Sequence, residues 1–169
     1  MKVKSLSHVG ITVKNFEKSV KWYWEHFKMP LLSIGTMTEN EIEKMEKLYG
    51  LKDTSVKFGF LRCPKGGVIE IFEFSKTLPP ESIWNRCGTS HLTLDVKNVK
   101  KWHQYLSGKG VDFLCKPQTT DGTEWAFLKD PDGNLIELID LKFNYFAIRK
   151  LGSLAGFFMR KNKYKKYYR

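Results

Sequence analysis

The sequence predicts an α+β protein made of two tandem βαβββ modules forming a concave sheet around a metal site, plus a basic C-terminal extension. Two repeated strings carry this prediction. Residues 7–15 (SHVGITVKN) return as residues 90–98 (SHLTLDVKN), and residues 66–73 (GGVIEIFE) return as residues 133–140 (GNLIELID). A third observation is the alternation of apolar and polar residues within these strings, which is typical of half-buried strands.

The first module, residues 1–75, begins with a predicted strand over residues 5–14. Its alternation places Val9, Ile11 and Val13 on one face and His8, Gly10 and Thr12 on the other. Asn15 is a suitable N-cap for a helix over 16–27. A strand is expected over 29–34, and a hairpin is expected from strands 55–62 and 67–74.

A helical insertion over residues 38–51 distinguishes the first module from the second. Thr38 and Glu41 have the spacing of a capping box, and Gly50 can end the helix. The stretch between the His and the Glu of the repeat is longer in the first half by about one such helix. The segment therefore reads as an insertion into the repeated unit.

A linker over residues 76–87, which contains two prolines, leads to the second module, residues 88–143. There the pattern predicts a strand over 89–96 and a helix over 98–108. Further strands are expected over 111–115, 123–129 and 134–141, with a turn at 130–133 between the last two. Each half thus has the order βαβββ.

Composition and charge exclude several classes of protein. No apolar run is long enough to span a membrane, and the first residues lead into a strand pattern, so secretion is not expected. Cys63, Cys87 and Cys115 are an odd number without C-x-x-C spacing, which favours reduced thiols and a cytoplasmic location. The net charge of +11 is concentrated in the basic aromatic tail, residues 144–169, which has eight Lys or Arg and no acid.

Four residues at equivalent positions of the repeat are candidate metal ligands: His8, Glu70, His91 and Glu137. A lone His on a strand is more often a satisfied core residue, but two His and two Glu at repeated positions favour a metal site. Their apolar strand neighbours would lie under the helices, leaving the His and Glu on the opposite face. Two imidazoles and two carboxylates suit one divalent ion, and Ni, Co, Zn, Mn and Fe are all compatible.

Aromatic side chains are candidates for lining the pocket, with core packing as the alternative. Phe72 and Phe74 share the face of Glu70, and Trp125 and Phe127 lie on the penultimate strand. Thr12 lies further along the face of His8. These five residues are predicted to bind the substrate. His26 and His103 lie on predicted helices and are expected to have packing or surface roles.

The tail has three interpretations. An apolar helical stripe could cover the body or a partner subunit, a basic amphipathic helix could lie on a membrane surface, or the segment could be solvated. Nucleic-acid binding is the least expected of its roles. We expect a small-molecule substrate and a homodimer, with the tail at the dimer interface or at a membrane surface.

Several motifs resemble the vicinal oxygen chelate superfamily, the group of glyoxalase I, methylmalonyl-CoA epimerase and extradiol dioxygenase. They are residues 7–13 with the aromatic helix that follows, and residues 67–71, 88–91 and 130–138. The resemblance covers residues from about 4 to 142 and leaves out the tail. It implies paired modules around one divalent metal, and it assigns the ligand role to His8, Glu70, His91 and Glu137.

The chemistry that the resemblance implies is proton transfer next to a carbonyl through a metal-stabilised enediolate, with Glu70 or Glu137 as the catalytic residue that moves the proton. The leading expectation is a metal-dependent isomerase, epimerase or lyase. The enzyme alternatives are lactoylglutathione lyase and an Fe(II) extradiol-type dioxygenase. The glutathione-contacting Arg and Asn of glyoxalase I enzymes fall where this chain has Thr12 and Phe74. A non-enzymatic protein that binds a drug or metabolite is the alternative from a different class.

Overall fold

The structure, a computed structural model, describes residue 3, residues 5–79, Trp84 and residues 87–168. The chain divides into two compact units. Unit 1 comprises Met1–Leu92 and Lys129–Leu135, and unit 2 comprises Thr93–Leu128 and Ile136–Arg169. The first sheet belongs to unit 1, and the turn at residues 130–134 groups with it although its flanking strands belong to the second sheet.

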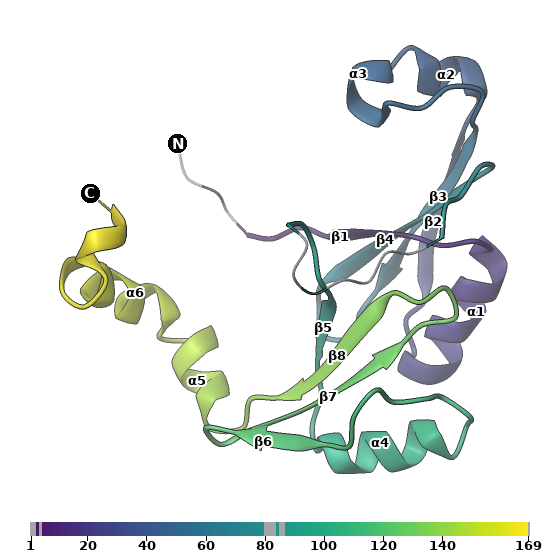
Figure 1. Ribbon diagram of the computed structural model, residues 1–169. Coiled ribbons are helices and arrows are strands. Elements are labelled where there is room, and N and C mark those ends of the chain that lie inside the picture. The colour runs from purple at the N-terminus through teal and green to yellow at the C-terminus, as the bar shows by residue number, and fades with distance from the viewer. Residues whose placement is uncertain (1–2, 4, 80–83, 85–86, 169) are drawn as a thin grey trace. The chain divides into compact units, whose positions relative to one another are not determined.

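The sheet of unit 1 has four strands in the order β1-β4-β3-β2 (Figure 1). They are β1 (Val9–Thr12), β2 (Leu31–Met37), β3 (Val56–Arg62) and β4 (Val68–Phe74). The β1 strand pairs in parallel with β4, and the other pairs are antiparallel. The β1–β4 register places Gly10 opposite Glu70 and Thr12 opposite Phe72.

Helix α1 (Phe16–Phe27) follows β1 and supplies one side of the core of unit 1. Asn15 caps it as predicted, because its side chain accepts a hydrogen bond from the Lys18 amide at 2.8 Å. The Glu73 carboxylate accepts another from the Phe16 amide at 2.6 Å. Fully buried residues from the helix and the sheet form the core: Phe16, Tyr23, Leu61, Ile69 and Ile71.

The predicted insertion forms two short helices instead of one. They are α2 (Glu39–Glu43) and α3 (Glu46–Tyr49). The capping box is present, with Thr38 and Glu41 bonded reciprocally, and Gly50 ends α3 in the left-handed conformation with φ of 63°. Ile42 is fully buried and anchors the insertion.

The sheet of unit 2 repeats this arrangement in the order β5-β8-β7-β6. Its strands are β5 (Leu92–Asp95), β6 (Gln118–Thr120), β7 (Thr123–Lys129) and β8 (Leu135–Asp140), and α4 (Val99–Ser107) follows β5. The capping of the helix is repeated as well: Asn98 accepts from the Lys101 amide, and Asp140 accepts from the Asn98 amide. The predicted α+β class with two βαβββ modules is confirmed.

The tail contains α5 (Asn144–Arg149), α6 (Gly152–Lys161) and the 3-10 helix η1 (Lys165–Tyr168). The basic extension is thus helical in most of its length. Among the residues described, no helix is both long enough and apolar enough to cross a membrane.

Several sequence predictions differ from the structure. The strand predicted over 111–115 is wrong, because that stretch has one isolated bridge, Phe113 to Leu128, and the ladder begins later at β6. The strands beginning at 5 and at 89 are shorter than predicted, with β1 starting at Val9 and β5 at Leu92. The linker prediction over 76–87 falls partly outside the described residues.

Candidate metal centre

His8 and Glu70 are brought together in unit 1. His8 Nε2 lies 3.2 Å from Glu70 Oε2, and their side chains are 42% and 15% exposed. His8 directly precedes β1, and Glu70 is central in β4, whose register with β1 places it opposite Gly10. Parallel pairing of these strands therefore makes neighbours of two residues that lie far apart in the sequence.

The geometry of this pair fits a shared ion. Two donor atoms bound to one divalent metal at roughly 2.1 Å, with an angle of roughly 90–109°, lie roughly 2.9–3.4 Å apart. The observed 3.2 Å falls in that range. The partial exposure of His8 leaves room for further ligands.

Ser7 fixes the other side of the His8 ring. Its Oγ lies 3.1 Å from His8 Nδ1. A serine hydroxyl both donates and accepts, so it can hold the ring in either tautomer. If Nε2 bound a metal, Nδ1 would carry the proton and could donate to Ser7, an arrangement that orients metal-binding histidines.

The second copy of the repeat has the same support for its histidine. Ser90 Oγ lies 2.9 Å from His91 Nδ1, and the His91 ring lies 5.3 Å from the Trp84 ring. In unit 2, Thr93 donates a hydrogen bond to Glu137 Oε2 at 3.0 Å. The equivalent of Thr93 in the first copy is Gly10, so Glu70 has no hydroxyl beside it from that position.

The burial pattern around the two glutamates agrees with the predicted faces. Ile69 and Ile71 beside Glu70, and Ile136 and Leu138 beside Glu137, are buried, whereas both glutamates are only partly buried. In unit 1, the described residues include no third His, Cys, Asp or Glu close enough to complete an ion site with His8 and Glu70. The His8–Glu70 pair therefore supplies fewer donors than the four that a divalent ion takes from a protein and solvent.

An aromatic surface surrounds Glu70 in unit 1. Phe72 stacks on Phe74 with ring centroids 6.1 Å apart, and Phe58 lies 6.1 Å from Phe72 across the β3–β4 pair. Phe60 pairs with Glu70 in the ladder, and its ring meets the His8 ring edge-on at 5.7 Å. The predicted pocket residues Phe72 and Phe74 thus lie on the face that bears the candidate ligands.

Two glycines lie where this aromatic surface comes close to the backbone. A Cβ at Gly35 would lie 2.4 Å from the Phe58 ring, and one at Gly10 would lie 3.2 Å from Phe72. The first distance is shorter than real Cβ contacts show, so a side chain at position 35 would displace the Phe58 ring.

In unit 2, Trp125 and Phe127 form the corresponding aromatic pair. Their ring centroids are 5.8 Å apart, and Trp125 Nε1 donates to Thr120 Oγ1 at 3.1 Å. They alternate along β7 with the buried residues Ala126 and Leu128. Both rings therefore lie on the face opposite the buried core of that strand.

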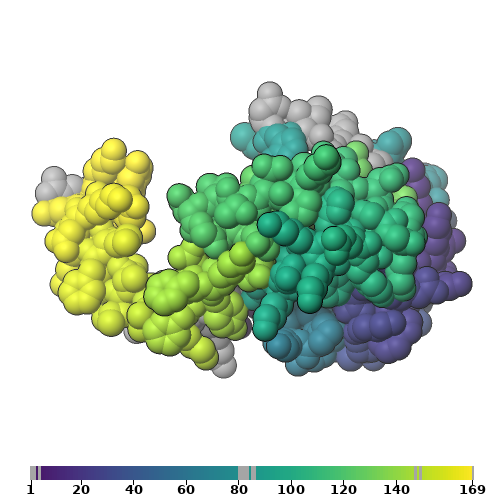
Figure 2. All heavy atoms as spheres, turned by 90° about the horizontal axis from the view of Figure 1, so that it is seen from below, coloured from purple at the N-terminus to yellow at the C-terminus, as the bar shows by residue number. Residues whose placement is uncertain are grey.

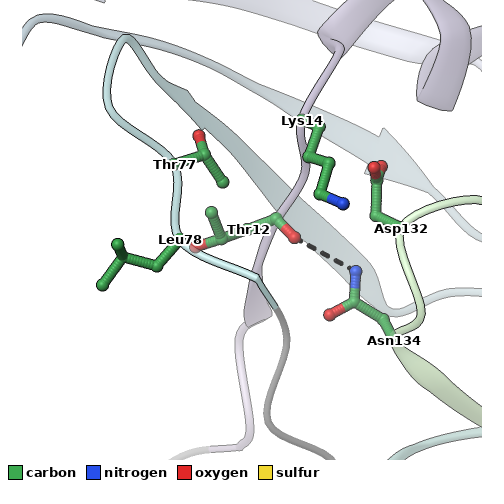
Figure 3. Close-up of a pocket in the computed structure, with 6 residues that line it drawn as sticks. All are labelled: Thr12, Lys14, Thr77, Leu78, Asp132 and Asn134. Atoms are coloured by element: carbon green, nitrogen blue, oxygen red, sulfur yellow. Dashed lines mark hydrogen bonds between the residues drawn. The ribbon is translucent and has the colours of Figure 1, made fainter.

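Thr12 lines a small recess in unit 1, of about 90 Å³ (Figure 3). The recess is lined by Thr12, Lys14, Thr77, Leu78, Asp132 and Asn134. One edge is fixed by Asn134 Nδ2, which donates to the Thr12 carbonyl at 3.1 Å. A recess of this volume is smaller than the roughly 300–1,000 Å³ of ordinary ligand pockets.

The turn at residues 130–134 is held on α1 by buried polar contacts. Tyr23 Oη donates to Asp130 Oδ2 at 3.1 Å, and Ser19 Oγ donates to Asp132 Oδ2 at 3.1 Å. Burial raises the pKa of the Asp130 carboxyl, and burial together with the Asp130 charge holds the pKa of Tyr23 well above its usual value. These groups are structural and lie outside the set of candidate ligands.

Sequence reasoning missed four residues that belong with the candidate ligands: Ser7, Ser90, Phe58 and Phe60. Both serines directly precede a histidine in the repeated string, which is a signal for an orienting hydroxyl. Phe58 and Phe60 precede Glu70 at the same spacing with which Trp125 and Phe127 precede Glu137. That equivalence could have identified them.

The chain belongs to the Glyoxalase/Bleomycin resistance protein/Dioxygenase superfamily, whose model matches residues 5–138. Among curated proteins it is 32% identical over 146 residues to a lactoylglutathione lyase of Schizosaccharomyces pombe, covering 82% of this chain and 48% of that protein. It is 27% identical to the uncharacterized protein YwkD of Bacillus subtilis, covering 83% of this chain and 99% of that protein.

Solved structures support the fold. A glyoxalase family protein from Bacillus cereus aligns with a TM-score of 0.68 and 18% identity, covering 83% of this chain and 95% of that chain. Glyoxalase I from Zea mays aligns with a TM-score of 0.58 and 23% identity, covering 79% of this chain and 43% of that chain. The chain spans about half the length of the curated lactoylglutathione lyase that it matches.

Proposed function

We propose that this protein is a metal-dependent isomerase, epimerase or lyase that transfers a proton at the carbon next to a carbonyl of a small oxygenated substrate. The observation that carries the proposal is the His8–Glu70 pair at 3.2 Å, with Ser7 behind the imidazole. The Ser90–His91 contact, which repeats the Ser7–His8 contact, and the Thr93–Glu137 hydrogen bond support it. Superfamily membership is consistent with this chemistry.

In this proposal His8, Glu70, His91 and Glu137 bind one divalent ion, with Ni, Co, Zn, Mn or Fe all suited to two imidazoles and two carboxylates. The bound ion supplies Lewis-acid polarisation of the substrate oxygens. Ser7 and Ser90 hold the imidazole rings in orientation. The aromatic residues at positions 72, 74, 125 and 127, together with Thr12, bind the substrate and exclude water.

The proton is moved by Glu70 or Glu137 in this proposal. A carboxylate within reach of the reacting carbon can accept a proton from it and return the proton to a neighbouring atom. The two glutamates differ in their surroundings, since Thr93 donates to Glu137 whereas Gly10 lies opposite Glu70. Glutamine at either position keeps the shape of the side chain and removes its capacity to take a proton.

Lactoylglutathione lyase is the second candidate, because the Schizosaccharomyces pombe relative carries that name. The chain is also 28% identical over 153 residues to a glyoxalase I of Saccharomyces cerevisiae, and this match covers 79% of this chain and 44% of that protein. The contacts at Thr12 argue for a different specificity. Its carbonyl is taken by Asn134, and its side chain has no cationic group with which to bind a carboxylate of glutathione.

The test combines metal analysis with solvent-deuterium exchange. Metal-reconstituted protein is incubated in deuterated buffer with a hemithioacetal, an acyl-CoA or a keto-sugar, and exchange next to the carbonyl is followed by mass spectrometry. We expect a bound divalent ion and exchange into one substrate class, with exchange lost in Glu70→Gln or Glu137→Gln. Glu25→Gln, an exposed change on α1, is the matched control.

Three results would contradict this proposal. An absence of bound metal in both the wild-type protein and Glu137→Gln after reconstitution would remove the metal site. Oxygen consumption with a catechol under ferrous iron would instead identify a dioxygenase. Tight binding of a drug or metabolite that survives both chelation and His8→Ala would identify a binding protein.

A homodimer is part of the proposal, as is a small-molecule substrate. Sedimentation equilibrium of the metal-loaded protein measures the mass directly. A monomer mass at the concentration used for activity would remove the dimer from the proposal without affecting the chemistry.

A further inference from the structure

The C-terminal basic segment, residues 144–169, exposes most of the side chains that the structure describes in it. Every described residue from Ser153 to Tyr168 is exposed. Large apolar side chains are among them: Leu154 is 59% exposed and Phe158 is 55% exposed. Figure 2 shows side chains of this segment, coloured yellow, at the surface on the face drawn.

The exposed apolar residues of α6 lie on one side of the helix. Leu151, Leu154 and Phe158 follow one another at spacings of three and four, so they share a face, while Arg160 lies on the other side. A ten-residue helix is marginal by itself in water and is stabilised mainly by packing of its apolar face. The face of α6 therefore needs a surface to cover it.

The charge of the segment selects that surface. It carries eight Lys or Arg and no Asp or Glu. Several of these cations lie against aromatic rings, with Lys161 Nζ 4.4 Å from the Phe157 ring and Lys166 Nζ 5.0 Å from the Tyr167 ring. Cationic and aromatic groups side by side are typical of segments that lie in the headgroup region of a bilayer.

Other surfaces fit less well. A second copy docked through the same segment would place two strongly basic segments face to face in a two-fold contact, at a cost in like-charge repulsion. Nucleic acid matches the charge and can stack on the tyrosines, but it offers no apolar surface to Leu151, Leu154 or Met159. An anionic bilayer offers both negative headgroups and an acyl boundary.

The root of the segment is fixed to the second sheet. Asn144 Nδ2 donates to the Asp121 carbonyl at 3.0 Å and to Thr123 Oγ1 at 3.1 Å, next to the β6–β7 turn. At about 1.5 Å per residue, α6 is roughly 15 Å long, half the roughly 30 Å of a hydrocarbon core. It is thus too short to cross a bilayer and is suited to lying in its surface.

We propose that the C-terminal basic segment binds the surface of an anionic phospholipid bilayer, with the Leu151–Leu154–Phe158 face in the acyl boundary and the lysines of residues 163–166 at the headgroups. Binding of this kind combines buried apolar area with attraction to anionic lipid, so it weakens with salt. The proposal is independent of the chemistry proposed for the metal ligands.

Vesicle co-sedimentation of the full-length chain tests it. We expect the wild type to bind vesicles of phosphatidylcholine mixed with phosphatidylglycerol, and to be released by salt. A charge variant, Lys163→Gln with Lys165→Gln and Lys166→Gln, should bind at least about tenfold more weakly. An apolar variant, Leu154→Glu with Phe158→Glu, should lose binding by about tenfold or more.

The matched controls make the same kinds of substitution elsewhere, three lysines in one and a single apolar residue in the other. Lys44→Gln with Lys47→Gln and Lys65→Gln removes three exposed lysines of unit 1, and Leu48→Glu changes an apolar residue that is 73% exposed. Both should bind vesicles like the wild type. Far-ultraviolet circular dichroism checks that all variants remain folded.

Several outcomes would overturn the proposal. They are an absence of wild-type binding to anionic vesicles, equal binding to phosphatidylcholine alone, or an equal loss in the controls. If the wild type does not bind vesicles and the apolar variant has a lower mass in solution than the wild type, the apolar face of α6 contacts a second copy of the chain. Salt-sensitive binding to duplex DNA that the apolar variant retains, without vesicle binding, would assign the segment to nucleic acid.

Discussion

The Tyr23 hydroxyl is a buried donor whose acceptor lies far along the chain. Tyr23 is fully buried, and Asp130, which is 5% exposed, accepts its hydrogen bond. Asp130 also accepts from the Asp132 and Asn134 amides and from the Asn134 side chain. Removing the hydroxyl therefore leaves a buried carboxylate that has lost one of several donors.

We expect Tyr23→Phe to lower the free energy of unfolding by about 1–3 kcal/mol at neutral pH, because a charged acceptor loses a buried partner. Urea denaturation followed by tryptophan fluorescence measures the change. Tyr105→Phe, on a tyrosine that is 43% exposed, is the control and should stay within about 0.5 kcal/mol of the wild type. Equal loss in both variants would contradict the role of the Tyr23–Asp130 bond.

The same substitution predicts a pH dependence. The pKa of Tyr23 is held well above its usual value by burial and by Asp130. A group whose pKa is raised by folding contributes stability that is fully present below its pKa in the unfolded chain, about 10 for tyrosine. That stability is lost as the pH rises toward its pKa in the folded protein. The stability difference between wild type and Tyr23→Phe should therefore narrow above about pH 10. Parallel curves between pH 8 and pH 11 would refute it.

Thr93 is the hydroxyl that holds Glu137. If Glu137 binds metal, Thr93→Val should weaken metal affinity about 10- to 100-fold, the usual effect of losing a hydrogen bond to a ligand. Competition with a chelating dye measures this. Thr36→Val, an exposed change in β2, is the matched control and should leave affinity unchanged. Unaltered metal affinity in Thr93→Val would contradict the assignment of Glu137 as a metal ligand.

At the scale of single elements, the α2 helix depends on its cap. Thr38 Oγ1 accepts from the Glu41 amide, and the Thr38 amide donates to Glu41 Oε2 at 2.8 Å. Thr38→Ala should cost about 0.5–2 kcal/mol of local helix stability. Hydrogen exchange of amides in residues 39–49 should rise, while that of β3 and β4 stays protected. Asn40→Ala, in the same turn, serves as the control.

The pKa of Glu41 gives this element a pH dependence. Its bonds to the Thr38 amide and hydroxyl lower the pKa. The stability that they contribute is present above the unfolded value and is lost as pH falls through the lowered value. Exchange protection of α2 in the wild type should therefore decline in acid, and Thr38→Ala should show less of this decline.

Much of the secondary structure could be predicted, because caps and periodicity act over a few residues. Asn15, the Thr38–Glu41 box and the strand alternation each appear in the structure as expected. The strand over 111–115 failed for a physical reason. The alternation of Val111 and Phe113 reflects packing: Val111 is buried, and the Phe113 ring packs on His103 with ring centroids 4.4 Å apart. Pro117 directly precedes β6, where pairing with β7 begins.

The candidate ligands could be found because each of them occurs at the same position in both copies of the repeat. The repeat identified His8 with His91 and Glu70 with Glu137 without any contact being known. Supporting residues were harder to find. Phe60 meets His8 only because the β3–β4 register places it opposite Glu70, and register depends on pairing between distant segments.

At the scale of the whole molecule, the duplication is incomplete, and the differences are specific. Tyr23 and Asp130 are replaced at the repeat-equivalent positions by Leu106 and Cys63, so that polar contact exists once. The helical insertion and the basic segment also occur once. The duplicated part carries the candidate metal ligands. The helical insertion and the basic segment make the two halves of the chain different.

The number of metal ions per chain tests whether the four candidate ligands act together. Among the described residues, the His8–Glu70 pair has no third His, Cys, Asp or Glu beside it, and alone it has too few donors for a tightly bound ion. We therefore expect one ion per chain, lost in His8→Ala and equally in His91→Ala, measured by elemental analysis after gel filtration. His103→Ala on α4 is the control and should retain the ion. Two ions per chain, or loss of only one of two in each variant, would show that the two copies of the repeat bind metal separately.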